Sequence, residues 1–162
     1  MIIGVTGDTH NNLKSIKIIC SIFNESRADL VFHTGDITLP KSLLAFRELE
    51  CPLRVVFGNN DIGDKTDLIE ASKSFECDLN EEPLNMNIQG KKFAVIHHPE
   101  LIDERMIKEN DYIFHGHTHR YRLENIHGCT IFNPGECAGF MKDKNQVGIL
   151  NLDKSEPQII NF

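Results

Sequence analysis

The feature that most constrains the fold is a repeated change from apolar to polar residues, with a glycine at the border. In the first half of the chain, three short apolar runs end in Gly7, Gly35 and Gly58, and a carboxylate or amide residue follows each glycine. Such runs, bounded by glycine, are typical of buried strands. Since the carboxyl ends of parallel strands meet at one edge of a sheet, the pattern predicts a polar cluster there.

Helical patterns separate these strands, and this alternation predicts a parallel sheet with helices packed on it. The strands expected in the first half cover residues 2–7, 30–34 and 53–57, and the helices cover 13–26, 41–49 and 66–75. The chain therefore begins as an α/β unit.

The second half reads mainly as short strands separated by Gly, Asn, Asp or Pro. A hairpin is expected over 84–89 and 92–97, around Gly90, and a helix over 101–109. Further strands are expected at 111–115, 121–126, 129–133, 146–152 and 157–161. With 162 residues, the sequence predicts a single domain, 1–162, with a mixed β-core and helices on its outer faces.

Charge and hydropathy restrict the function. The net charge is −7 and no block of Lys or Arg occurs, which argues against long nucleic acids as partners. No apolar stretch is long enough to span a bilayer, and residues 1–7 do not resemble a secretory signal. The expectation is a cytoplasmic protein that does not bind membranes.

Metal-ligating residue types follow five of the expected strands. They comprise two carboxylates, one amide and four imidazoles: Asp8, His10, Asp36, Asn59, His97, His117 and His119. One ion would not need seven ligands, whereas two ions would if one carboxylate bridged them. Mixed nitrogen and oxygen ligands suit Mn, Fe, Co, Ni or Zn better than Mg or Ca.

The motifs that carry these residues are GDTH (7–10), GD (35–36), GNND (58–61), His97 and GHTH (116–119). In this order they resemble the calcineurin-like metallophosphoesterase superfamily, and within it the small phosphodiesterases of bacteria and archaea, which share their fold with a retromer subunit. The resemblance implies a four-layer α/β/β/α sandwich of two mixed sheets flanked by helices. It assigns Asp8, His10 and His119 to one metal, Asn59, His97 and His117 to the other, and Asp36 to the bridge.

Two positions depart from the family pattern. Asn60 stands where many relatives have a histidine that is a candidate general acid; an amide cannot donate a proton in that way, but it can hydrogen-bond a phosphate oxygen. Glu136 stands where relatives often have serine; we expect it to point to solvent, with repulsion of dianionic monoesters as the alternative. His98 is a candidate substrate contact or a surface residue, and Asp61 is expected to hold the GNND loop or orient a neighbouring ligand.

The resemblance implies a metal-dependent phosphodiesterase in which a metal-bridging hydroxide attacks a small phosphodiester. Two divalent transition-metal ions per chain are expected, with Mn favoured and Ni, Co, Fe or Zn as alternatives. A phosphomonoesterase or nucleotidase and a non-catalytic, retromer-like binding scaffold are the competing hypotheses. A homodimer is a further expectation that rests on the resemblance alone.

Overall fold

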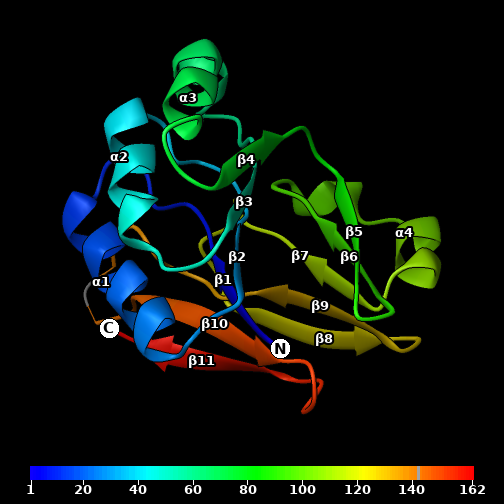
Figure 1. Cartoon of the computed structure of the whole chain (residues 1–162). Coiled ribbons are helices and arrows are strands. Elements are labelled where there is room, and N and C mark those ends of the chain that lie inside the picture. Colours follow the sequence, from blue (N-terminus) through cyan, green and yellow to red (C-terminus); the bar gives the residue numbers. More distant parts are fainter. Residues whose placement is uncertain (142) are drawn as a thin grey trace.

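The computed structural model describes residues 1–141 and 143–162. Two β-sheets pack face to face, and helices cover the outer face of each sheet (Figure 1). The layers follow the order helix, sheet, sheet, helix. The four-layer sandwich implied by the sequence resemblance is therefore confirmed.

The larger sheet has six strands in the order β11-β10-β1-β2-β3-β4. Strands β1 to β4 are parallel, whereas β10 is antiparallel to β1 and to β11. The bounds are β1 Ile2–Thr6, β2 Leu30–His33, β3 Leu53–Val56, β4 Cys77–Asn80, β10 Gln146–Asn151 and β11 Pro157–Asn161. The predicted parallel core of the first half is confirmed.

The smaller sheet has five strands in the order β5-β6-β7-β9-β8. Strands β6, β7 and β9 run parallel, and the edge strands β5 and β8 are antiparallel to their neighbours. The bounds are β5 Leu84–Ile88, β6 Lys91–Val95, β7 Tyr112–Phe114, β8 Arg122–Ile126 and β9 Cys129–Asn133. The predicted hairpin around Gly90 is the β5–β6 pair.

The helices are α1 Leu13–Glu25, α2 Pro40–Ala45, α3 Lys65–Ser72 and α4 Glu104–Glu109, with 3₁₀ turns at Phe46–Glu48, Ile62–Asp64 and Pro99–Leu101. Three differ from expectation. The helix predicted over 66–75 ends at Ser72, and the helix predicted over 41–49 changes to a 3₁₀ turn at Phe46. The helix predicted over 101–109 begins only at Glu104, because the Asp103 side chain accepts the backbone N–H of Met106 and so caps the helix there.

Three hydrophobic clusters fill the spaces between the four layers. Because side chains alternate across a strand, Val31 of β2 packs under α1 while its neighbour Phe32 faces the other sheet. The Phe32 ring lies between the sheets, with its centroid 6.1 Å from that of Phe93 and 5.8 Å from that of Phe114. On the far side, Ala94 of β6 packs with Met106 of α4.

Strand β4 was not expected from the sequence. It is an edge strand of four residues, and its only apolar side chains are Cys77 and Leu79, which pack into the cluster under the helices. Two apolar positions are too short a pattern to reveal a strand.

In the described residues, no helix combines the length and the apolar character needed to cross a bilayer.

We predict that Phe32→Ala lowers the free energy of unfolding by about 3–5 kcal/mol, because it leaves a cavity between the sheets. Urea unfolding measures this change. The matched control is Ile69→Ala on α3, where the side chain is 42% exposed, and where a change within about 0.5 kcal/mol is expected. Equal losses in both variants would contradict the assignment of Phe32 to the inter-sheet core.

Candidate metal centre

The five strand ends that the sequence marks as polar lie at one edge of the sandwich. All seven predicted ligands come from loops that follow β1, β2, β3, β6 and β7, and the structure brings them into one cluster. Hydrogen bonds join the loops directly: the backbone N–H of Asp8 donates to Gly35, and that of His10 donates to Asp36. The position of the cluster follows from strand polarity, as predicted.

Asp8, His10 and His119 form one group at this edge. Their ligand atoms lie within 4.8 Å of one another. His10 Nε2 is 3.4 Å from His119 Nε2, which in turn is 3.8 Å from Asp8 Oδ1. Two imidazole nitrogens and a carboxylate oxygen thus converge from two loops that are far apart in the chain, those after β1 and β7.

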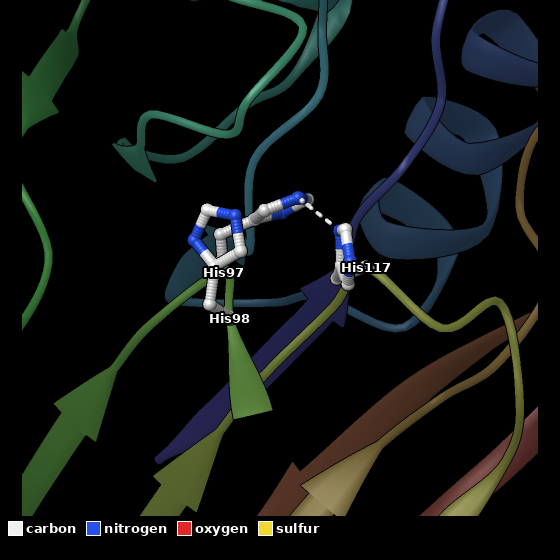
Figure 2. Close-up of side chains that lie close together, drawn as sticks. All are labelled: His97, His98 and His117. Carbon is white, nitrogen blue, oxygen red and sulfur yellow. Dashed lines mark hydrogen bonds between the residues drawn. The ribbon is translucent and has the colours of Figure 1, made fainter. Parts of the chain in front are cut away.

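Asn59, His97 and His117 form a second, tighter group. His97 Nε2 lies 3.0 Å from Asn59 Oδ1, and His117 Nδ1 lies 3.1 Å from both of these atoms. Figure 2 shows the contact between the His97 and His117 rings. Ligands held about 2.1 Å from a common ion lie roughly 3.0–3.4 Å apart, so this spacing suits one metal ion.

Asp36 lies between the two groups. Its Oδ2 is 3.6 Å from His97 Nε2, and Asp8, Asp36 and His97 together form a third set of ligand atoms within 4.8 Å. This is the position that the family resemblance assigns to a bridging carboxylate.

Hydrogen bonds fix which nitrogen of each histidine is free. His97 Nδ1 donates to the carbonyl of Thr34 at 2.8 Å, which leaves Nε2 with its lone pair toward Asn59 and His117. His33, one strand away, accepts the N–H of Gly35 on Nδ1, so its Nε2 carries the proton and donates to Thr9. His33 is therefore a buried structural residue.

Glu136 does not point to solvent, and that expectation was wrong. Its side chain is 2% exposed, and Oε2 accepts a hydrogen bond from His119 Nδ1 at 2.7 Å. Its other oxygen accepts the backbone N–H groups of Ala138 and Phe140. These donors lie in the turn that follows Glu136, and the sequence alone did not show that this turn folds back over the carboxylate. Glu136 thus holds His119 with Nε2 free to bind.

Asp61 holds two of the ligand loops, as the sequence predicted. Its buried carboxylate accepts backbone N–H groups from Gly58 at 2.8 Å, Asp36 at 2.9 Å and Thr38 at 2.6 Å. These bonds tie the loop that carries Asn59 to the loop that carries Asp36.

Glu82 plays a similar part and was missed by the sequence reasoning. One of its oxygens accepts the backbone N–H groups of His97 and His98, and the other lies 2.5 Å from His98 Nδ1. Burial alone raises the pKa of Glu82, but these hydrogen bonds outweigh it and lower the pKa below its usual value. Glu82 lies outside every motif, so no local pattern could have identified it.

The two predicted catalytic residues lie beside the ligands. Asn60 donates from its backbone and its side chain to the two oxygens of Asp36, at 2.8 and 2.7 Å. The His98 ring lies 5.0 Å from the His117 ring, measured between centroids, and His98 belongs to a possible ligand set with His97 and His117. Figure 2 shows His98 beside His97 and His117.

The electrostatics of the cluster favour a cation. Burial, followed by the charge of Asp36, raises the pKa of Asp8 to about 8. Burial also lowers the pKa values of His10 and His97, which keeps both imidazoles neutral. In the described part of the chain, no Lys or Arg forms an ion pair with these carboxylates. Converging lone pairs without a counter-charge fit divalent metal ions.

The backbone is strained at the same place. Five of the predicted ligands have left-handed φ values: Asp8 (50°), His10 (46°), Asp36 (61°), His117 (68°) and His119 (53°). Such residues cost about 1–3 kcal/mol each and gather at functional sites. Gly116 is required for space, because a Cβ there would lie 2.6 Å from Asp8 Oδ2.

Comparison with known proteins agrees with this geometry. A model of the calcineurin-like phosphoesterase superfamily domain matches residues 1–155. The chain belongs to this family. The family prediction drawn from the five motifs is therefore confirmed, and with it membership of a class of phosphoric ester hydrolases.

One curated protein and two solved structures show what the chain is similar to. Phosphodiesterase MJ0936 of Methanocaldococcus jannaschii is 33% identical over 96% of both chains. A solved archaeal phosphodiesterase superposes with a TM-score of 0.91 at 31% identity and covers both chains completely. A zinc complex of Vps29 from Entamoeba histolytica, 18% identical, covers 99% of both chains with a TM-score of 0.67, which shows the shared fold alone.

We predict that Asp8→Asn changes how the stability of the metal-free protein depends on pH. With a pKa of about 8, folded Asp8 keeps its proton where the unfolded carboxyl, with a pKa of about 4, has lost it. The folded state then binds more protons than the unfolded state, so the free energy of unfolding falls as pH rises between these values. Because asparagine cannot ionise, Asp8→Asn should remove the decrease in the free energy of unfolding that the ionisation of Asp8 causes.

The measurement is the Tm in chelator at about pH 5 and pH 9 for both proteins. Relative to the wild type, the variant should gain stability at the higher pH, whereas exposed Asp67→Asn should follow the wild type. Parallel curves for Asp8→Asn and the wild type would show that Asp8 ionises normally in the folded chain.

We also predict that Glu136→Gln weakens metal binding by about 10–100-fold. The glutamine oxygen must accept the N–H groups of Ala138 and Phe140, so its NH₂ faces His119 Nδ1. That nitrogen then has to accept, which moves the ring proton to Nε2 and removes the lone pair from the metal side. Nitrogen NMR of the imidazole reports the tautomer, and metal titration reports the affinity.

The control is Glu124→Gln, an exposed partner of Arg122, which should leave both readouts unchanged. An unaltered His119 tautomer in Glu136→Gln, together with wild-type metal affinity, would rule out the positioning role.

Proposed function

We propose that this chain is a dinuclear-metal phosphodiesterase that hydrolyses a small phosphodiester. The observation that carries the proposal is the arrangement of two adjacent ligand sets with a carboxylate between them. In this assignment Asp8, His10 and His119 hold one ion, Asn59, His97 and His117 hold the other, and Asp36 bridges. The 33% identity to a protein named phosphodiesterase supports the reaction class.

Divalent cations bound there would supply Lewis-acid charge to the phosphoryl oxygens and a lowered pKa to coordinated water. The protein chain positions the metal ligands. Strained loops and buried hydrogen bonds hold the ligands in fixed positions before substrate arrives, so little reorganisation is needed during the reaction. Mn is the favoured ion, with Ni, Co, Fe or Zn as alternatives of similar ligand preference.

A diester suits the charges of the site better than a monoester. A diester carries one negative charge and a monoester nearly two, and Asp8, Asp36 and Glu136 already concentrate carboxylates at the cluster. No ion pair in the described residues places Lys or Arg among the predicted ligands. The anion with less charge is therefore the better match.

Asn60 and His98 are proposed to contact the reacting group. Asn60 uses one amide hydrogen on Asp36, and its second can reach a phosphate oxygen. His98 Nδ1 donates to Glu82, which turns Nε2 toward the site; in the imidazolium form of the ring, Nε2 would donate a hydrogen bond to the leaving-group oxygen. This arrangement would place the leaving group on the side of His97 and His98.

The test is hydrolysis of a bis-aryl phosphodiester beside the aryl monoester, after chelation and addition of one metal at a time. We expect Mn or a related ion to restore turnover of the diester, and Asp36→Ala and His117→Ala to abolish it because each disrupts the pair of ions. The control is His127→Ala in the β8–β9 turn, which should retain wild-type turnover.

Two results would reject the proposal. A higher kcat/KM for the monoester would favour a phosphomonoesterase or nucleotidase. Failure of every metal to support turnover, with two ions bound per chain, would favour the binding scaffold.

A further inference from the structure

Phe140 combines strong exposure with a position against the predicted metal ligands. Its ring is 71% exposed, yet its centroid lies 5.3 Å from that of His10 and 5.9 Å from that of His119. The ring plane is inclined by only 25° to the His119 ring. A large apolar ring therefore lies in contact with one ligand set while most of its surface remains in water.

The backbone of Phe140 is fixed by a buried group. Glu136 Oε1 accepts the N–H of Phe140 at 2.9 Å, and the same carboxylate binds the His119 ring through Oε2. Asn12 fastens the same turn by donating to the carbonyl of Ala138 at 2.7 Å. The position of Phe140 is thus coupled to that of a predicted ligand by a carboxylate that is 2% exposed.

A cleft of about 530 Å³ begins at His119, the residue whose ring packs against that of Phe140. Tyr121 and Met141 supply apolar surface to its walls, and Arg120 and Lys144 supply cations. Tyr121 is 52% exposed, and its ring is held edge-on against buried Phe132. An aromatic wall with cationic neighbours suits a planar aromatic group better than an aliphatic chain.

Exposed apolar residues are frequent in the loops that carry the predicted ligands or the residues that hold them. Among the described residues, eight large hydrophobic side chains are exposed, and five of them lie in loops after β3, β6, β7 and β9: Ile62, Leu101, Tyr121, Phe140 and Met141. These loops, the turn after β9 included, also carry predicted ligands or the residues that hold them. Exposed apolar surface next to a polar site indicates a ligand that has both an apolar part and a polar part.

We propose that Phe140, with Tyr121 and the cleft beside His119, is a subsite for a planar aromatic substituent of the phosphodiester, such as an aryl group or a nucleobase. This inference rests on the proposed function. With the phosphoryl group at the metal centre and the leaving group on the side of His98, the second ester substituent extends past His10 and His119 and stacks on Phe140.

The test compares equilibrium binding of three poorly reactive diesters to the Mn-loaded protein: diphenyl, dibutyl and dimethyl phosphate. We expect diphenyl phosphate to bind at least about tenfold more tightly than the other two. Phe140→Ala should remove most of this preference, and Phe140→Trp should preserve it. The binding of dimethyl phosphate should remain within about twofold in both variants, because it reports the metal centre alone.

A second readout uses phenyl p-nitrophenyl and methyl p-nitrophenyl phosphate, which release the same leaving group. Phe140→Ala should lower kcat/KM about tenfold for the phenyl compound and leave the methyl compound nearly unchanged. Binding preference for diphenyl phosphate without turnover of any diester would overturn the proposed function and retain the aromatic subsite.

Three outcomes would overturn the subsite itself. Dibutyl and diphenyl phosphate could bind equally, which would exclude an aromatic preference. Phe140→Ala could weaken all ligands to the same extent, which would indicate damage to the metal centre. Finally, sedimentation could show that Phe140→Ala is a monomer where the wild type is a dimer, with ligand preference unchanged. That result would identify Phe140 as part of an interface between copies.

Discussion

The fold brings the lone pairs of several side chains together at one edge of the sandwich. Their mutual repulsion is the constraint that the rest of the structure has to offset. Two carboxylates, an amide oxygen and four imidazoles converge there, with contacts as short as 3.0 Å between His97 and Asn59. The rise of the Asp8 pKa to about 8 shows the cost of collecting such groups away from water. Divalent cations would remove this cost, and the same cations would give the site its chemistry.

Three carboxylates outside the predicted ligand set keep the arrangement in place. Asp61, Glu82 and Glu136 each accept at least two backbone N–H groups, and the two glutamates also bind a ring nitrogen of His98 or His119. Because every oxygen has a hydrogen-bond partner, these side chains are held rigidly in place. They fix the loops whose left-handed residues would otherwise relax.

The sequence predicted the parts of this structure that depend on chain direction and on glycine. Strands that run parallel deliver their carboxyl ends to one edge, so the seven candidate ligands could be named before their distances were known. Glu82 and Glu136 could not be predicted in the same way, since each acts through a contact between segments far apart in the chain. His119 and Glu136 are 17 residues apart, and His98 and Glu82 are 16 apart.

The same limit applies to Asn60 and β4. The sequence shows that Asn60 cannot act as an acid, but its two hydrogen bonds to Asp36 depend on the turn after β3. Strand β4 owes its existence to pairing with β3 and not to a pattern of its own. Local sequence predicts local structure, whereas edge strands and buried polar contacts are decided by tertiary packing.

The measurement that tests the central claim most directly is electron paramagnetic resonance of the protein titrated with Mn. Two ions that share Asp36 as a bridge are close enough for their spins to couple. The spectrum should therefore show an exchange-coupled pair once two ions are bound per chain, and only uncoupled signals in a variant that lacks the bridge, such as Asp36→Ala. A wild-type spectrum of isolated Mn at saturation, or binding of a single ion, would contradict a dinuclear centre.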